Sequence, residues 1–237
     1  MMSSKYLGMD ESEDSMIVDE RFVTYINSLD TGNTPLLEEI EQEALQTYVP
    51  IIRKEMQTFL KWLLAVKCPN RILEVGTAVG FSALFMAEYN PVPCEITTIE
   101  NYEKRIPVAR KNFERADRTQ QITLLEGDAA VRLKELTEPY DMIFMDAAKG
   151  QYIHFMDDVL RLLKTGGILV SDNVLQDGDI IESRFAVTRR NRTIHKRMRD
   201  YLYQLTHHEE LRTSVLPFGD GVTVSVKLGK EFLRQNR

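Results

Sequence analysis

The stretch RILEVGTAVGFS, residues 71–82, decides the fold. It begins with a short apolar run and continues through Gly76 and Gly80 into a segment rich in apolar residues. Such a run predicts a buried strand, and glycines at these two positions predict a tight turn that leads into a helix. A strand, a glycine turn and a helix make the first unit of an alternating α/β fold.

The same alternation continues along the chain. The predicted strands lie at residues 71–75, 95–99, 121–125, 140–145 and 167–171. The predicted helices between them lie at residues 81–89, 102–115, 129–136 and 152–163. Nearly continuous apolar strands joined by helices predict right-handed βαβ units, so we expect an α/β fold with a doubly wound, Rossmann-like parallel sheet.

The segments outside this alternation predict one domain with appendages. Residues 1–20 are acidic and poor in apolar side chains, so we expect a disordered tail. Residues 21–66 show helical periodicity and predict a helical arm on an α/β core at 71–228, within a single domain at 21–237. The stretches 211–216 and 222–227 flank Pro-Phe-Gly-Asp-Gly and predict a closing antiparallel pair of strands.

Composition excludes several classes of protein. The 237 residues are 43% hydrophobic and 28% charged, which is typical of a globular domain. No apolar run is long enough to cross a membrane, and the acidic N-terminal stretch has no apolar segment like that of a signal peptide. Two cysteines cannot build a disulfide scaffold or a four-thiolate zinc site. We therefore expect a cytoplasmic, enzyme-sized domain.

The turn after the first strand favours an adenosyl ligand without phosphate. In doubly wound sheets, ligands bind beyond the carboxyl ends of the strands. The spacing of Gly76 and Gly80 is not the Gly-x-Gly-x-x-Gly of dinucleotide sites, and Glu74 would repel a diphosphate. Glu100 ends the second strand, where a carboxylate can hold ribose hydroxyls. A ribose and a positive centre together describe S-adenosylmethionine, although a tight turn and a surface acid are the simpler alternatives.

Three oxygen donors follow the fourth and fifth predicted strands. Asp146, Asp172 and Asn173 would meet at the edge of the sheet and suit Mg²⁺, or Mn²⁺ or Ca²⁺ in its place, better than zinc. A helix N-cap is the alternative role of Asp172 and Asn173. Lys149 follows Asp146 closely, and a nearby cation would lower the pKa of its ammonium, which predicts a general base. Without a metal, Lys149 would be an ordinary surface charge.

At these residues the chain resembles the cation-dependent O-methyltransferases, which include the catechol and caffeoyl-coenzyme-A O-methyltransferases. The resemblance covers residues 45–228 and is carried by the motifs at 73–77, 80–82, 98–100, 126–129, 146–152, 171–175 and 216–221. It implies an S-adenosylmethionine- and divalent-metal-dependent O-methyltransferase that forms a homodimer, with Lys149 as the base and Asp146, Asp172 and Asn173 as the metal ligands. The cofactor contacts predicted on this basis are Ile52, Glu74, Gly76, Thr77, Ser82, Glu100, Asp128, Ala129 and Asp146.

A basic segment at residues 184–199 holds seven Arg and Lys residues and no acid, on a chain of net charge −6. Solvated helix faces usually intersperse acids with bases, so this segment favours a polyanion, although a solvated face remains the alternative. We predict RNA contacts at Arg184, Arg189, Arg190, Arg192 and Arg197. The segment is similar to one in the bacterial tRNA 5-hydroxyuridine methyltransferases, which implies methylation of an anticodon 5-hydroxyuridine to 5-methoxyuridine.

Other functions stay open at this point. The alternative acceptor is a small catechol-like phenol or an acyl-coenzyme-A ester. An oxidoreductase using nicotinamide or flavin would lack its phosphate-binding turn here. A non-enzymatic nucleic-acid-binding module would leave the cluster of Asp146, Asp172 and Asn173 unexplained. Binding of S-adenosylmethionine but not NAD would separate the methyltransferase from both.

Overall fold

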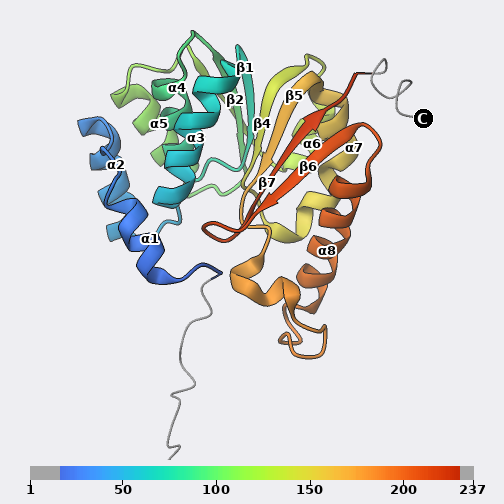
Figure 1. Cartoon of the computed structure of the whole chain (residues 1–237). Helices are drawn as coiled ribbons and strands as arrows, with labels where there is room; N and C mark the ends of the chain where they lie inside the picture. The colour runs from blue at the N-terminus through green and yellow to red at the C-terminus, as the bar shows by residue number, and fades with distance from the viewer. Residues whose placement is uncertain (1–16, 230–237) are drawn as a thin grey trace, which may run out of the picture.

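The computed structural model describes residues 17–229, which form one seven-stranded sheet with helices on both faces (Figure 1). The strands run in the order β3-β2-β1-β4-β5-β7-β6. Their bounds are β1 Arg71–Val75, β2 Glu95–Glu100, β3 Ile122–Glu126, β4 Tyr140–Met145, β5 Leu163–Ser171, β6 Leu211–Leu216 and β7 Val222–Lys227. The first five strands pair in parallel, and β7 runs antiparallel to both β5 and β6. The predicted α/β sheet with a closing antiparallel pair is confirmed.

Helices fill the connections and the N-terminal region. Their bounds are α1 Glu20–Asn27, α2 Pro35–Gln46, α3 Lys54–Lys67, α4 Phe81–Tyr89, α5 Ile106–Arg115, α6 Ala129–Glu135, α7 Tyr152–Leu162 and α8 Arg192–His207. Two short 3-10 helices follow β4 and β5, at η1 Lys149–Gln151 and η2 Gln176–Ile181. Within the described part of the chain, no helix is both long and apolar enough to span a membrane.

Side chains of each central strand alternate between two hydrophobic cores. On β4, Phe144 packs with residues of α3 and α4, whereas Met145 packs with residues of α7 and α8. Figure 1 shows the corresponding layers, with α3, α4 and α5 on one face of the sheet and α6, α7 and α8 on the other. Both faces of the parallel strands are therefore buried, as their apolar sequences require.

The register of the strands brings several loops to one edge of the sheet. Val75 at the end of β1 pairs with Met145 at the end of β4, which in turn pairs with Ser171 at the end of β5. The next residues extend the ladder, since Asp146 N donates to Val75 O and Asp172 N donates to Met145 O, both at 3.0 Å. The residues that follow β1, β4 and β5 therefore begin at the same level.

Several boundaries differ from those expected. The helix expected at 102–115 begins at Ile106, with proline in its first turn, and β5 begins at Leu163. Helix α8 occupies the second half of the basic segment, where a helix was only the alternative interpretation. Of the expected tail, residues 1–16 lie outside the described residues, whereas Asp19 caps α1 through the backbone N–H of Arg21.

We expect Gly76→Ala to destabilise the fold by roughly 3 kcal/mol, as measured by urea unfolding. Gly76 has φ +95°, and a Cβ there would lie 2.3 Å from the carbonyl oxygen of Asp146. The control is Gly166→Ala, because Gly166 has φ +74° with no atom within 4 Å of an added Cβ. Backbone strain alone should cost the control about 1–2 kcal/mol. Equal losses in the two variants would contradict the close approach of the β1–α4 turn to β4.

Candidate active site

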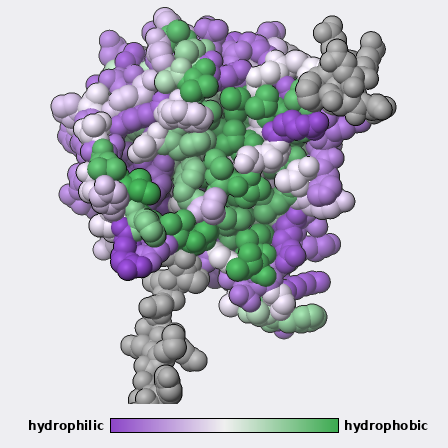
Figure 2. Space-filling model, in the orientation of Figure 1, coloured by the Kyte–Doolittle hydropathy of each residue, from purple (hydrophilic) through white to green (hydrophobic). Residues whose placement is uncertain are grey.

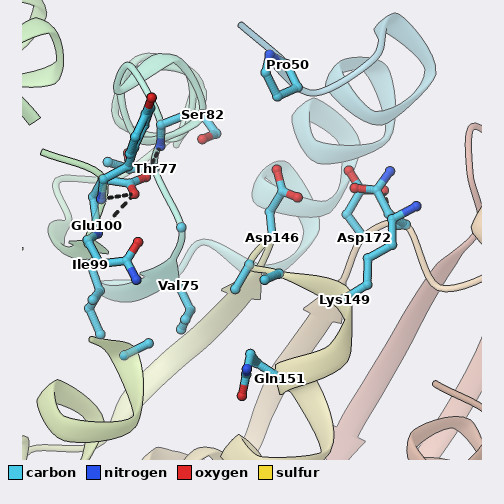
Figure 3. A pocket seen from close by; sticks show the side chains of 18 of the residues that line it. Pro50, Val75, Thr77, Ser82, Ile99, Glu100, Asp146, Lys149, Gln151 and Asp172 are labelled. Carbon is cyan, nitrogen blue, oxygen red and sulfur yellow. Dashed lines mark hydrogen bonds between the residues drawn. The ribbon is translucent and has the colours of Figure 1, made fainter. Parts of the chain in front are cut away.

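A cavity of about 690 Å³ opens at the carboxyl ends of β1, β2, β4 and β5. Figure 3 shows two groups of polar side chains in it, with Glu100 and Thr77 at one end and Asp146, Lys149 and Asp172 at the other. The sequence-predicted residues on its wall are Ile52, Gly76, Thr77, Ser82, Glu100, Asp128, Ala129, Asp146, Lys149, Asp172 and Asn173. The topology thus brings together residues that are spread over more than a hundred positions of the chain.

Glu100 is held in place by the backbone at the end of β2. Its Oε2 accepts a hydrogen bond from Ala78 N at 2.7 Å, and its Oε1 accepts from Tyr102 N at 2.9 Å and Asn101 N at 3.0 Å. The carboxylate therefore links the turn after β1 to the turn after β2. Its position on the cavity wall is set by main-chain groups, which leave the side chain little freedom to move.

Glu74 lies elsewhere than we expected. We predicted a contact with the ligand, but Glu74 is fully buried in β1 and is not part of the cavity wall. Thr98 donates a hydrogen bond to its Oε2, while Oε1 has no hydrogen-bond partner. Burial raises the pKa of this carboxyl, against the opposing effect of the neighbouring Ser82 and Thr98 hydroxyls. Its neighbours Thr77 and Ser82 line the cavity, whereas Glu74 itself does not.

The remaining contacts predicted at this end come from turns. Asp128 uses its Oδ1 to accept from Ala130 N at 2.8 Å, which caps α6, and Ala129 follows it on the cavity wall. Ile52 reaches the cavity from the segment before α3. Thr77 Oγ1 is buried without a hydrogen-bond partner. This end of the cavity therefore offers apolar contacts from Ile52 and Ala129 and one hydroxyl, from Thr77, that has no partner.

Three oxygen-bearing side chains gather at the other end. Asp146 follows β4, while Asp172 and Asn173 follow β5, and Asn173 takes a left-handed φ of +58°. Asn173 N donates to Asp172 Oδ1 at 2.7 Å. Among the described residues no three His, Cys, Asp or Glu side chains form a group that could hold a metal ion, and the third polar side chain here is the amide of Asn173.

Negative charge accumulates at this end of the cavity. Burial raises the pKa of Asp146, and the Asp172 carboxylate raises it further. Burial also raises the pKa of Asp172, where a hydrogen bond from Asn173 N opposes the effect and Asp220 adds to it. Lys149 and neighbouring arginines offset only part of these effects. Two buried carboxylates this close are costly, so the arrangement favours binding of a further cation.

Two buried tyrosines support the strand ends from below. Tyr152 Oη lies 3.2 Å from Met145 O and 3.1 Å from Asp172 O, so one hydroxyl bridges β4 and β5. Tyr201 Oη lies 2.6 Å from Ser171 Oγ, and the two tyrosine rings pack edge to face. We assigned these residues no role from the sequence. Each lies in a helix, α7 or α8, where a buried aromatic residue cannot be told from an ordinary core residue by sequence alone.

Lys149 is paired with an acid from a distant part of the chain. Its Nζ lies 2.5 Å from Oδ2 of Asp220, which is 2% exposed and lies in the turn between β6 and β7. Arg53 and Asp177 form a second ion pair at 3.2 Å, and both line the cavity. The Gly-Asp-Gly motif could have drawn attention to Asp220, but its partner could not be inferred from spacing.

The basic segment lies outside the cavity but beside one of its loops. Arg184, Arg189 and Arg190 are exposed, and among the described residues none of them pairs with an acid. Arg192 Nε donates to Val187 O, and Arg197 Nη1 donates to Gly150 O at 3.2 Å. Arg197 thereby links α8 to η1, the turn that carries Lys149. The structure does not bring the five predicted RNA contacts into the cavity itself.

Known proteins share this architecture. A catechol O-methyltransferase from Niastella koreensis is 38% identical over 128 residues, which span 52% of this chain and 58% of that enzyme. Caffeoyl-CoA O-methyltransferase 5 from Nicotiana tabacum is 30% identical over 180 residues, or 70% of each protein. The crystal structure of an SAH-bound methyltransferase from Podospora anserina superposes with a TM-score of 0.80 at 25% identity, covering 96% of this chain and 100% of that chain.

The family comparison covers nearly the whole described chain. A model of the O-methyltransferase family matches residues 27–228, which include helices α2 and α3, the sheet and every residue named above on the cavity wall. The chain therefore belongs to the O-methyltransferase family, and it is an S-adenosylmethionine-dependent O-methyltransferase.

Proposed function

We propose that the enzyme methylates one of two adjacent oxygens on a small catechol-like phenol, with the help of a divalent cation. The observation that carries the proposal is the group of Asp146, Asp172 and Asn173 in the same cavity as Glu100. Three hard oxygen donors suit a cation that can also bind two neighbouring oxygens of an acceptor. The names of the catechol and caffeoyl-CoA relatives support this class of acceptor.

The residues at the Glu100 end fit S-adenosylmethionine. The fixed Glu100 carboxylate can accept hydrogen bonds from ribose hydroxyls, and the unpartnered Thr77 Oγ1 offers a further polar contact. The close packing of Gly76 against Asp146 leaves no room for a side chain there. When bound, the cofactor supplies an electrophilic methyl group on a sulfonium centre.

The residues at the acidic end fit a hard divalent cation. The buried carboxylates of Asp146 and Asp172 repel each other, and a cation would relieve that repulsion. Oxygen-only donors suit Mg²⁺, Mn²⁺ or Ca²⁺. When bound, such an ion lowers the pKa of an acceptor hydroxyl.

Lys149 is the group that we propose to accept the proton of the acceptor hydroxyl. It is the only lysine among the described residues that line the cavity, and it lies at the same end as Asp146 and Asp172 (Figure 3). Holding the cofactor and the acceptor in one cavity brings the reacting groups together, which lowers the barrier to transfer. Lys149 thus accepts the proton, and the residues of the cavity wall orient the acceptor.

Exposed apolar surface supports the homodimer that the family resemblance implies. Helix α1 has no buried residues, and its apolar side chains Phe22 and Tyr25 are more than 60% exposed. Trp62 and Val66 of α3 are also exposed, and Figure 2 shows apolar surface gathered over the face where α3 and β7 lie. Large apolar patches usually mark interfaces.

We expect Asp172→Ala and Asp146→Ala each to lower methyl transfer at least about 100-fold, because each removes a charged ligand of the cation. Transfer is measured with labelled S-adenosylmethionine and a catechol acceptor, and EDTA should reproduce the loss in the unaltered enzyme. Calorimetry should show that Asp172→Ala still binds the cofactor. Asp158→Ala, which removes an ion-paired aspartate on α7 outside the cavity, is the control. Full activity in metal-free buffer would contradict the proposal.

A tRNA acceptor is the second candidate, and the basic segment favours it. Arg184, Arg189 and Arg190 are exposed, and Arg197 contacts the turn that carries Lys149. A 5-hydroxyuridine offers a hydroxyl beside a carbonyl oxygen, which is a chelating pair like that of a catechol. An anticodon base can leave its stack while arginines hold the neighbouring phosphates.

We expect Arg189→Ala/Arg190→Ala to flatten the salt dependence of anticodon stem-loop binding. Each lost phosphate contact should reduce the slope of log affinity against log salt by about 0.7, so the pair should reduce it by about 1.4. Lys111→Ala/Lys134→Ala removes the same charge from exposed positions on α5 and α6 and should leave the slope unchanged. Equal slopes in all three proteins, with no loss of 5-methoxyuridine in cells lacking the gene, would exclude the tRNA acceptor.

A further inference from the structure

Asp220 accepts two hydrogen bonds at the cavity wall, and the proposed function assigns this residue no role. Its Oδ2 accepts from Lys149 Nζ at 2.5 Å, and its Oδ1 accepts from the backbone N–H of Asp177. The side chain is 2% exposed, yet it forms part of the cavity wall. A buried carboxylate thus ties the turn between β6 and β7 to the lysine that faces the acceptor.

The backbone around Asp220 is hydrogen-bonded to the segment after Asp172 and Asn173, the two candidate metal ligands that follow β5. Leu175 N donates to Asp220 O and Val174 N donates to Gly221 O, both at 3.0 Å. Gly221 has φ +77°, and a Cβ there would lie 2.1 Å from Leu175 Cγ. The carboxylate therefore cannot shift without moving the chain beside Asp172.

We propose that Asp220 is a positioning residue for methyl transfer. It holds Lys149 Nζ at the acceptor end of the cavity, and it stabilises the ammonium that forms there. This inference rests on the proposed function, in which Lys149 accepts the proton.

The reaction balances in charge as well as in atoms. In this step Lys149 enters as the free amine, after it has released a proton to solvent. The acceptor proton then moves to its Nζ, and a lone pair of the acceptor oxygen forms the new bond to the methyl carbon. The S–CH₃ bond breaks, and its electron pair stays on sulfur. The positive charge that begins on the sulfonium therefore ends on Lys149, beside Asp220.

A second lysine–aspartate pair in the same chain provides a matched comparison. Lys164 Nζ donates to Asp141 Oδ1 at 2.8 Å, and Asp141 Oδ2 accepts from the backbone N–H groups of Asn70 and Arg71. Asp141 does not line the cavity. The two aspartates share one bonding pattern, although Asp141 is more exposed. A purely structural role predicts a loss of stability, without a separate loss of kcat, when either loses its charge.

The test compares Asp220→Asn, Asp220→Glu and Asp141→Asn with the unaltered enzyme. Asparagine keeps an acceptor for Asp177 N–H but removes the charge that faces Lys149. We expect Asp220→Asn to lower kcat at least about 100-fold, as loss of proton-transfer catalysis does. The dissociation constant of S-adenosylmethionine should change less than about twofold. Asp220→Glu should recover most of kcat, and Asp141→Asn should lower the melting temperature while leaving kcat nearly unchanged.

A readout that does not depend on turnover is the rate at which limiting acetic anhydride modifies Lys149, followed by mass spectrometry. Lys134, which is exposed, is the internal reference. Asp220→Asn should raise the rate at Lys149 severalfold. If that rate and kcat are both unchanged, or if Asp141→Asn lowers kcat equally, the positioning role is wrong. Should Asp220→Asn fail to fold, Asp220→Ser removes the same charge, and unaltered labelling and kcat in that variant would overturn the role equally.

The proposed function and the positioning role of Asp220 are tested separately. If the unaltered enzyme methylates no acceptor with vicinal oxygens, the proposed function is wrong. The labelling result still decides whether Asp220 holds Lys149.

Discussion

The repulsion between two buried carboxylates is the constraint around which this site is built. Asp146 and Asp172 follow neighbouring parallel strands whose last residues pair in register, so hydrogen bonds of the sheet hold both at one edge. Neither can move away without breaking the ladder, and Tyr152 ties the two strand ends together from below. The fold thus holds negative charge at a position where burial disfavours it. Such strain is tolerated at functional sites when surrounding structure enforces it.

The other features of the cavity follow from the same edge. Gly76 is required because the turn after β1 passes against the backbone of Asp146, and this close approach places Thr77 and Glu100 on the opposite wall. The antiparallel pair at the end of the chain returns Asp220 to the acidic side, where it meets Lys149. Lys149 and Arg53, each paired with an aspartate, thereby lie at the end of the cavity that also holds Asp146 and Asp172. The end of the cavity with Glu100, which ends β2, and the end with Asp146, which follows β4, lie on either side of β1.

Much of this arrangement could be predicted from the sequence, because it depends on local patterns. Apolar runs located the strands, and the residues directly after them supplied Glu100, Asp146 and Asp172 to the cavity wall. Other features depend on contacts between distant residues. The pairing of Lys149 with Asp220 joins positions 71 residues apart. Glu74 was assigned to the cavity because it lies close to the end of the first strand, but both faces of β1 are covered, so its side chain is buried. Helix α8 was missed because its basic face hid the buried positions of His195, Met198, Tyr201 and Leu205.

The stability of the metal-free protein against pH, with and without added Mg²⁺, tests the central claim most directly. The pKa of Asp146 is raised to about 8, so the folded state binds protons that the unfolded chain releases above about pH 4. Stability from this site is therefore complete at low pH and is lost as the pH rises toward 8. We predict that the rise in melting temperature caused by Mg²⁺ grows from pH 6 to pH 8 and disappears in Asp146→Asn. A Mg²⁺ effect that is absent, or that is equal at both pH values and in the variant, would contradict the account.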